Sequence, residues 1–305
     1  MAVWIVTGGS GFLGGHLLGR LSREPTAGVE VVAVGRTLPA GWAGRFVPAD
    51  YADRDRVAEV VRELQPAVVF HLAGRTPPAR PEEFYQGNTL ATVAWLDALR
   101  GLDLPVRVVL AGSAAELGPV PVEHLPVGEE WACRPSDPYG LSKYLATAAG
   151  MAARPPLEVV VARIFNPIGP GLPASQALGR FARALAGGDG PVTLTVGDLN
   201  ARRDFVDARD VAAALVALAE RGRSGQVYHV GTGRSHRVGD GLDRLVALSG
   251  RSVTIRVDPS LGRPAGPTDS RADILRIRAE VDWAPRVEWE RSLADLWASL
   301  PPGSD

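Results

Sequence analysis

Tyr139 and Lys143 form the pair of residues in this sequence that is best suited to acid–base chemistry. They are four residues apart, so on a helix their side chains project from one face. The phenol of a tyrosine, with a pKa of about 10, is a poor proton donor or acceptor at neutral pH. A nearby ammonium stabilises the phenolate and brings that pKa towards the working range. The pair therefore predicts a tyrosine that moves a proton.

Lys143 is the only lysine among the 33 lysine and arginine residues of the chain. This bias is typical of a genome that replaces lysine by arginine wherever the chemistry tolerates it. A compact ammonium whose pKa can be tuned by burial does not exchange freely with a guanidinium, so the retained lysine favours a functional role. The alternative interpretation is a solvated lysine beside a half-buried tyrosine at the start of a helix.

Ser113 completes the candidate catalytic group. It follows an apolar run at residues 106–111, and the carboxyl ends of parallel strands meet at one edge of a sheet. We expect its hydroxyl to hydrogen-bond a substrate oxygen at that edge, beside Tyr139. The histidine, cysteine and acidic residues show no persuasive metal-ligand spacing, so no metal is predicted.

Gly8, Gly11 and Gly14 form a second candidate site, between an apolar run at residues 3–6 and a helical pattern. Glycine lets the backbone turn tightly and approach a pyrophosphate, which the amino end of the following helix then stabilises. The spacing and its context predict a dinucleotide site.

The residue that selects the coenzyme is expected at the end of the next strand, residues 29–34. An Asp or Glu about 20 residues after the glycines would bind the ribose diol of NAD. The sequence has Gly35 and Arg36 at that point, and Arg36 could pair with a 2′-phosphate. This favours NADP, with NAD as the second possibility. The alternative is an exposed loop arginine.

Short apolar runs alternate with amphipathic patterns through the first half of the chain. Strands are expected at residues 3–6, 29–34, 67–72, 106–111 and 157–162, and helices at residues 13–21, 57–64, 89–99 and 138–149. Nearly continuous apolar strands indicate a parallel sheet that is covered on both faces. The predicted fold class is α/β, with a Rossmann-type doubly wound parallel sheet.

This alternation breaks after Phe165. A Gly/Pro-rich loop at 166–173 is followed by expected helices at 176–185, 210–220, 239–248 and 292–300, and by expected strands at 192–196, 226–230 and 252–257. We predict a smaller, discontinuous C-terminal substrate-binding lobe over the carboxyl edge of the sheet. Residues 1–165 plus about 204–230 would form the dinucleotide-binding domain, and about 166–203 plus 231–305 the lobe.

Composition limits the classes of function. The 305 residues carry a net charge of −1, which provides no basic field for nucleic acid or an anionic membrane. The single cysteine, Cys133, cannot form an internal disulfide. No apolar run reaches the roughly 18 residues of a membrane span, and no charged leader precedes the first apolar run. We therefore expect a cytoplasmic protein.

Together these motifs resemble the extended short-chain dehydrogenase/reductase family over most of the chain. The resemblance rests on Ser113 and on the segments TGGSGFLG (7–14), HLAG (71–74) and YGLSK (139–143). Within the family, RIFNPIGPG (163–171) and RDFVD (203–207) most resemble nucleotide-sugar enzymes. GSAAE (112–116) and the later Arg263-Pro264 fit the GDP-4-keto-6-deoxymannose reductases.

The resemblance also implies roles for individual residues. Ser113 and Tyr139 would hold the carbonyl or hydroxyl, while Lys143 would bind the nicotinamide ribose and tune Tyr139. Coenzyme contacts are implied for Gly8, Gly11, Phe12, Leu13, Gly14, Arg36, Asp50, Tyr51, Leu72, Ala73, Gly74, Asn88, Tyr139 and Lys143, Asp50 matching the family's adenine-contacting acid. Substrate contacts are implied for Ser113, Asn166, Arg203 and Arg263, since arginine forks suit a diphosphate. Surface arginines and a turn asparagine are the alternatives.

Departures from the family pattern narrow the expected reaction. Family dehydratases carry an Asp-Glu pair directly after the serine or threonine, where this chain has Ala114 and Ala115, so a 4,6-dehydratase is not expected. Leu117 replaces a common tyrosine, which puts the substrate contacts there in doubt.

Three functions remain as hypotheses. The leading one is an NADPH-dependent 4-ketoreductase of a nucleotide-activated 6-deoxyhexose. The second is a nucleotide-sugar epimerase with the same triad and tightly bound NAD, and the third is a non-catalytic nucleotide-binding module. The resemblance also implies a homodimer formed through the helices at 88–99 and 139–149.

Overall fold

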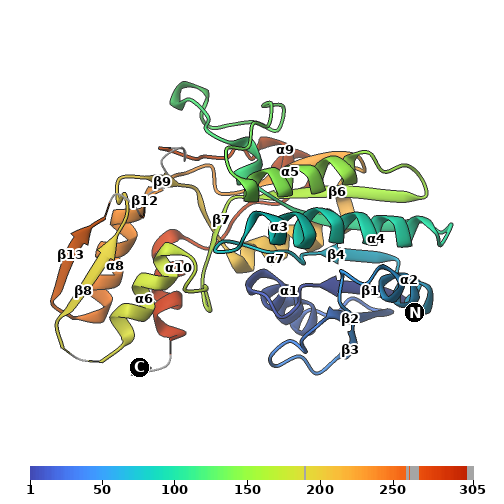
Figure 1. Ribbon diagram of the computed structural model, residues 1–305, viewed down its shortest axis with the longest axis horizontal. Coiled ribbons are helices and arrows are strands. Elements are labelled where there is room, and N and C mark those ends of the chain that lie inside the picture. Colours follow the sequence, from blue (N-terminus) through green and yellow to red (C-terminus); the bar gives the residue numbers. More distant parts are fainter. Residues whose placement is uncertain (189, 259–260, 262–267, 301–305) are drawn as a thin grey trace.

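The computed structural model describes residues 1–188, 190–258, 261 and 268–300. Its centre is a seven-stranded parallel sheet with the order β11-β6-β5-β4-β1-β2-β3 (Figure 1). The strands are β1 (Ala2–Thr7), β2 (Val29–Gly35), β3 (Arg45–Pro48), β4 (Val68–His71), β5 (Val106–Ser113), β6 (Leu157–Ile164) and β11 (Gln226–Val230). The strand order reverses between β1 and β4, and open α/β sheets bind ligands beyond the carboxyl ends of the strands at such a switch point. The predicted α/β class and Rossmann-type sheet are confirmed.

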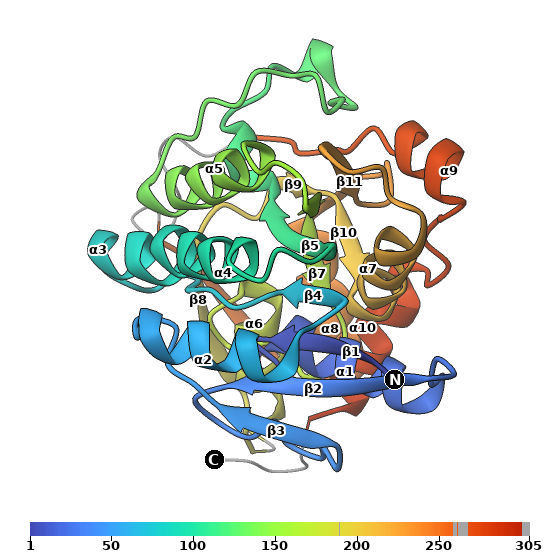
Figure 2. The same cartoon turned by 90° about the vertical axis from the view of Figure 1, so that its right-hand side faces the viewer.

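Helices cover both faces of this sheet (Figure 2). One face packs against α1 (Phe12–Arg23), α7 (Ala208–Arg221) and α9 (Leu275–Val281). The other face packs against α2 (Arg54–Leu64), α4 (Ala91–Arg100) and α5 (Pro138–Met151). Because β1, β4, β5 and β6 are buried from both sides, their sequences read as continuous apolar runs.

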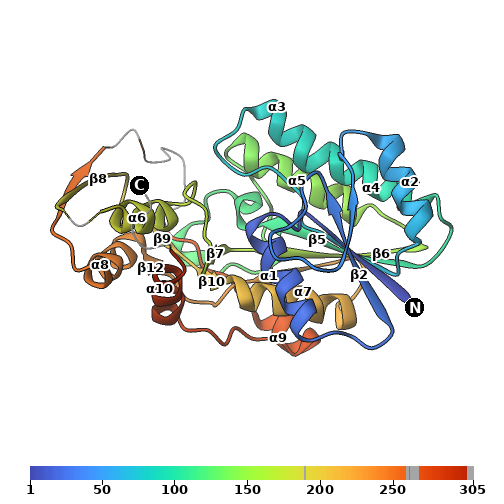
Figure 3. The same cartoon turned by 90° about the horizontal axis from the view of Figure 1, so that it is seen from below.

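A separate hydrophobic cluster lies beyond the carboxyl edge of the sheet (Figure 3). It is formed by α6 (Ala177–Ala186), α8 (Val238–Ser249), α10 (Trp289–Ala298) and the parallel pair β8 (Val192–Val196) and β13 (Val253–Val257). Two short pairs connect this region to the sheet, β7 (Asn166–Ile168) with β10 (Phe205–Asp207) and β9 (Arg202–Arg203) with β12 (His236–Arg237). No described helix combines the length and the apolar character that a membrane crossing requires.

Several short elements were not expected from the sequence. β3 has only two apolar residues before Pro48, a composition that suits an edge strand but gives no clear period. The other unexpected elements are α3 (Pro81–Phe84), α9, the short strands β7, β9, β10 and β12, the π-helix η1 (Tyr85–Leu90) and the 3₁₀ turns η2 (Ala114–Leu117) and η3 (Val122–His124). Of these, β7 lies in the segment 166–173, which was expected to be a loop. The longer helices and strands all appear where the hydrophobic patterns placed them, within a few residues at their ends.

Candidate active site

The turn after β1 is shaped for close approach of its backbone. Gly8 has a φ of 70°, which favours glycine. A Cβ on Gly14 would lie 2.1 Å from the Gly8 carbonyl oxygen, and a Cβ on Gly11 would lie 3.2 Å from the same atom. No described side chain caps α1, so its first amides are left for a ligand. The turn therefore fits a pyrophosphate at a helix amino end.

A cleft of about 840 Å³ opens between this turn and the C-terminal elements. Most of the residues that the sequence analysis singled out line it. They come from the turn after β1 and the start of α1, the ends of β4 and β5, η1, the start of α5, and the short strands β7 and β9. They are Gly8, Gly11, Phe12, Leu13, Gly14, Leu72, Gly74, Asn88, Ser113, Tyr139, Lys143, Asn166 and Arg203. The structure thus brings the glycine turn and the Ser-Tyr-Lys group into one cavity.

Four of the expected coenzyme contacts lie outside the lining of this cleft. Arg36 and Asp50 are exposed, just beyond β2 and β3. Ala73 is buried, and its amide donates to Thr7 Oγ1 at 3.2 Å. The phenol of Tyr51 lies beneath the glycine turn, where Gly8 N donates to its oxygen at 3.3 Å. Arg263, an expected substrate contact, lies outside the described residues.

Lys143 is held inside the protein and is not solvated. Its side chain is buried, with only 8% of the residue exposed, and its Nζ donates to the carbonyl oxygen of Ala111 at the end of β5. Burial lowers the pKa of the ammonium, and the charge of the buried Glu116 carboxylate acts in the opposite direction. The alternative of an ordinary surface lysine does not fit this position.

Tyr139 lies one turn before Lys143, in the first turn of α5. Asp137 caps that helix by accepting from Gly140 N at 2.7 Å, and Pro138 occupies its first position. A Cβ on Gly140 would lie 2.4 Å from the carbonyl oxygen of Ala115, so α5 approaches η2 too closely for any other residue there. This contact brings the half-buried Tyr139 to the same wall of the cleft as Ser113.

Ser113 is positioned by a buried ion pair whose members the sequence analysis gave no role. Its amide donates to Glu116 Oε1 at 2.7 Å, and Arg163 Nε donates to Glu116 Oε2 at 3.1 Å. Burial raises the pKa of Glu116, against the opposing charge of Arg163. The Ser-x-x-Glu spacing of a capping box is the signal that could have identified this contact.

Asn88 links the π-helix η1 to α5. Its Nδ2 donates to Ser142 Oγ at 2.8 Å and to the Arg75 carbonyl at 3.1 Å, and its Oδ1 accepts from Arg75 N at 2.7 Å. Ser142 Oγ in turn donates to the Tyr139 carbonyl at 2.7 Å. Single π-helical turns are frequent at functional sites, and this one joins the loop at 72–79 to the helix that carries Tyr139.

Asn166 and Arg203 line the opposite side of the cleft, on β7 and β9. Asn166 Nδ2 donates to the Asp204 carbonyl at 3.2 Å. The buried Asp204 carboxylate accepts from Thr232 and Gly233 amides at 2.8 and 3.0 Å, and from Ala272 N at 3.0 Å. These hydrogen bonds hold the backbone between these residues firmly in place. Arg203, on this strand, lines the cleft.

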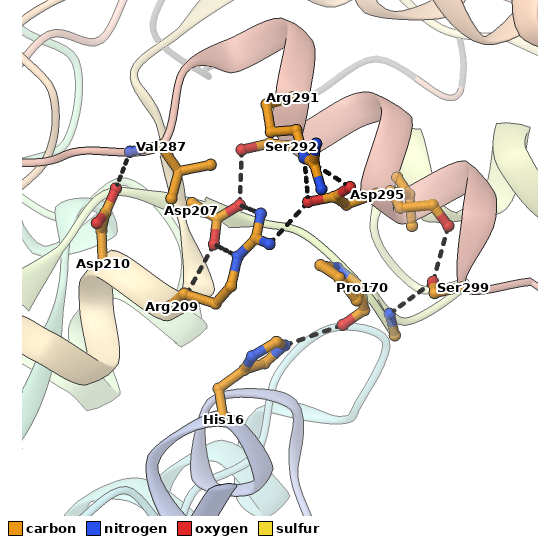
Figure 4. A network of polar contacts seen from close by, with 12 residues as sticks. His16, Pro170, Asp207, Arg209, Asp210, Val287, Arg291, Ser292, Asp295 and Ser299 are labelled. Carbon is orange, nitrogen blue, oxygen red and sulfur yellow. Dashed lines mark hydrogen bonds and ion pairs between the residues drawn. The ribbon is translucent and has the colours of Figure 1, made fainter. Parts of the chain in front are cut away.

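A charged network joins the end of β10 and the start of α7 to α10, and a separate contact holds the loop after β7 against α1 (Figure 4). Arg209 donates to Asp207 through two nitrogens at 2.8 Å and to Asp295 of α10 at 2.7 Å. His16 of α1 contacts the Pro170 carbonyl at 2.9 Å (Figure 4). The loop is thus tied to α1 on one side, while α10 is tied to the start of α7 on the other.

The burial of His71, at the end of β4, should make the stability of the protein depend on pH. Burial lowers its pKa from 6.5 to about 3, and its Nδ1 contacts Thr7 Oγ1 at 3.1 Å. Above pH 6.5 the neutral ring carries no penalty. As the pH falls below 6.5, His71 binds a proton in the unfolded chain but stays neutral in the folded chain. The free energy of unfolding therefore falls. His71→Asn should make that fall shallower by about 1.4 kcal/mol per pH unit, measured by denaturant unfolding between pH 6.5 and 4.5. An unchanged slope would contradict the assignment.

Among the described residues, no group of three His, Cys, Asp or Glu side chains is arranged to hold a metal ion. Residues 4–231 match the NAD dependent epimerase/dehydratase family. The chain belongs to this family.

Individual relatives of this epimerase/dehydratase family member include both reductases and epimerases. It is 31% identical to the GDP-6-deoxy-D-mannose reductase of Pseudomonas aeruginosa, over 94% of this chain and 93% of that protein. It is 29% identical to the UDP-glucose 4-epimerase of Azospirillum brasilense, over 98% of this chain and 96% of that protein. The structure of RMD from Pseudomonas aeruginosa complexed with NADPH superimposes with a TM-score of 0.84, at 29% identity and over 98% of each chain.

These comparisons show that the protein is an NAD(P)-dependent enzyme of the nucleotide-sugar reductase and epimerase family. The hypothesis of a non-catalytic module is therefore wrong. Reductase and epimerase relatives have similar identities, so the reaction must be argued from the site.

Proposed function

We propose that the protein is an NADPH-dependent 4-ketoreductase of a nucleotide-activated 6-deoxyhexose, with Tyr139 as the proton donor. The observation that carries the proposal is the burial of Lys143 one helical turn from Tyr139, in the same cleft as the glycine turn. Lys143, Tyr139 and Ser113 thus line one wall of a cavity large enough for a coenzyme and a sugar nucleotide.

The side chains divide the work of carbonyl reduction between them. The Ser113 hydroxyl and the Tyr139 phenol hold the sugar oxygen, and Tyr139 gives it a proton. The Lys143 ammonium stabilises the resulting phenolate and binds the nicotinamide ribose. When bound, NADPH would supply the hydride and Tyr139 the proton that together convert the ketone into an alcohol.

The preference for NADP rests on the end of β2. Gly35 and Arg36 stand where an acidic residue would bind the ribose diol of NAD, and the exposed Arg36 guanidinium is available for a 2′-phosphate. The similar structure from Pseudomonas aeruginosa was solved with NADPH, which supports the same assignment.

The substrate class is proposed from the other side of the cleft. We infer that Arg203 and Asn166 contact the sugar nucleotide, with Arg203 suited to a diphosphate. Asp50 and Tyr51 remain proposed contributors to the coenzyme site. We also propose the division into a coenzyme-binding unit (1–165 and about 204–230) and a substrate-binding lobe, because Arg203 and Asn166 belong to segments beyond the sheet.

A nucleotide-sugar epimerase is the second candidate, because an epimerase relative matches the chain over almost its whole length. An epimerase oxidises and then re-reduces one carbon, so it keeps its coenzyme and should purify with NAD bound. A reductase exchanges its coenzyme at every turnover, so we expect the purified protein to contain less than about a tenth of an equivalent. Stoichiometric NAD in denatured extracts would favour the epimerase.

A thermal-shift screen tests the substrate class most broadly. The protein is heated with GDP, UDP, dTDP or CDP, each with and without NADPH or NADH. A ligand held only by the folded state raises the melting temperature according to its occupancy. We expect NADPH and one nucleoside diphosphate each to raise it, and the two together to raise it further. The absence of a response to every nucleotide would contradict the sugar-nucleotide assignment.

We further propose a homodimer formed through α4 and α5. Leu141, Tyr144 and Leu145 lie on one face of α5 and are each 37–39% exposed, and Leu90, directly before α4, is 55% exposed. Leu145→Arg should convert the dimer to a monomer in analytical ultracentrifugation, because a charge cannot be desolvated in an apolar interface. Leu275→Arg, at an exposed leucine of α9, is the matched control and should leave the mass unchanged. A wild-type monomer would refute the proposal.

A further inference from the structure

Tyr51 supports the glycine turn through its phenol. Its hydroxyl donates to the Val34 carbonyl in β2 at 2.5 Å and accepts from the Gly8 amide at 3.3 Å. Gly8 is the first glycine of the turn and has a positive φ of 70°. One oxygen atom therefore bridges the end of β2 and the start of the phosphate-binding turn.

The phenol has little freedom to move. The Tyr51 ring lies edge-on to Trp95 and His71, with ring centroids 5.9 and 6.4 Å away. Burial raises the pKa of the phenol to about 12, so it stays protonated and keeps its bond to the Val34 carbonyl at every physiological pH. The oxygen is therefore fixed both by packing and by its two hydrogen bonds.

Gly35 lies directly against this oxygen. A Cβ at position 35 would be 3.1 Å from Tyr51 Oη, which is tighter than most real Cβ contacts. Such a contact is relieved only if its neighbour gives way, and the Tyr51 hydroxyl is bonded on two sides. A side chain at position 35 therefore requires the hydroxyl to shift by a few tenths of an ångström, which strains its hydrogen bonds to Val34 and to Gly8 of the turn.

Position 35 is also where coenzymes are distinguished. In this class of sheet, an acid at the end of the second strand binds the ribose diol of NAD. An aspartate there would place its Cβ 3.1 Å from the Tyr51 hydroxyl oxygen and add a carboxylate to a side chain that already crowds this hydroxyl. Arg36 is next in the chain and exposed, and its positive charge lowers the pKa of the Tyr51 phenol, against the larger effect of burial.

We propose that Tyr51 and Gly35 form a coupled pair that fixes the coenzyme preference, because the Tyr51 hydroxyl excludes an acid from position 35 and leaves Arg36 to bind the 2′-phosphate. Tyr51 is a positioning residue in this account, since it acts through Gly8 and Gly35. The inference rests on the coenzyme of the proposed function and deepens it. It predicts that an acid at position 35 cannot switch the enzyme to NAD while Tyr51 is present.

A double-mutant cycle of Gly35→Ala and Tyr51→Phe tests the coupling, with dissociation constants for NADPH measured by nucleotide fluorescence. Gly35→Ala should weaken NADPH binding about tenfold in the presence of Tyr51, and less than about twofold in the Tyr51→Phe background. Tyr51→Phe alone should weaken NADPH and NADH to the same extent. Gly128→Ala, at a glycine with open space around its Cβ position, is the control and should change neither affinity.

A second set of variants, based on Gly35→Asp, tests whether an acid at position 35 changes the coenzyme preference. With Tyr51 present, this variant should bind both coenzymes poorly, because the hydrogen bonds that support the turn are strained and the carboxylate repels the 2′-phosphate. Adding Tyr51→Phe should raise its NADH affinity at least about tenfold while NADPH binding stays weak. Melting temperatures measured alongside establish that each variant is folded at the temperature of the titration.

Additive effects in the cycle, or a full gain of NADH binding by Gly35→Asp alone, would overturn the coupled pair. A wild-type protein that prefers NADH would instead contradict the coenzyme of the proposed function. The two failures are distinguishable, because the first leaves the wild-type preference for NADPH intact.

Discussion

Tyr139→Phe should lower kcat for ketone reduction by about 10³-fold while leaving the dissociation constant for NADPH within about twofold. The substitution removes one oxygen from a ring that stays in place against Phe84, with 5.6 Å between ring centroids. General acid–base catalysis contributes about 10²- to 10⁴-fold, and the lost hydroxyl is the proposed proton donor. Single-turnover rates with saturating NADPH measure the effect.

Tyr144→Phe provides the matched control, since it makes the same change on the outer face of α5, where Tyr144 is 37% exposed. We expect its kcat to equal that of the wild type. A Tyr139→Phe enzyme that kept more than about a tenth of the wild-type kcat would show that another group donates the proton.

Gly14→Ala should weaken the binding of NADPH at least about 100-fold. Its Cβ would lie 2.1 Å from the Gly8 carbonyl oxygen, and that neighbour is backbone in the turn itself. The turn must open to relieve the contact, so the amides at the start of α1 lose their position around the pyrophosphate. Overpacking costs about 1–3 kcal/mol, and a contact this short belongs at the upper end, where about 3 kcal/mol corresponds to about two decades in affinity.

Gly15→Ala is the control for the previous substitution. A Cβ on Gly15 meets only the Gly9 carbonyl oxygen, at an ordinary distance of 3.8 Å. The two variants add the same methyl group to the same helix one residue apart. Equal affinities of the two variants for NADPH, measured by calorimetric titration, would contradict the proposed turn.

The sequence predicted the parts of the site that depend on local pattern. The parallel sheet follows from apolar runs that a doubly covered strand requires, and the glycine spacing at 8, 11 and 14 is set by one short turn. Tyr139 and Lys143 could be paired because one helical turn joins them. Their shared cleft with Ser113 followed from the topology, since parallel strands end at one edge.

Side-chain contacts between residues that are far apart in the sequence could not be predicted in this way. Glu116 and Arg163 meet 47 residues apart, and Tyr51 reaches Gly8 across 43 residues, through side chains that no periodic pattern marks. The short pair of Asn166 with Phe205 has too few residues to show an alternation. Residues that support a site from the neighbouring strand therefore appear only once the strands are aligned.

Transfer of deuterium from NADPH tests the central claim most directly. The enzyme is incubated with GDP-4-keto-6-deoxymannose, or the analogue with the base selected by the thermal-shift screen, and with NADPH deuterated at the transferable position of its nicotinamide ring. The account predicts one deuterium at C4 of the product sugar and one NADPH oxidised for each sugar reduced, by mass spectrometry and absorbance. A ketone that stays unreduced, with no deuterium at C4 and no NADPH oxidised under conditions where NADPH is bound, would contradict it.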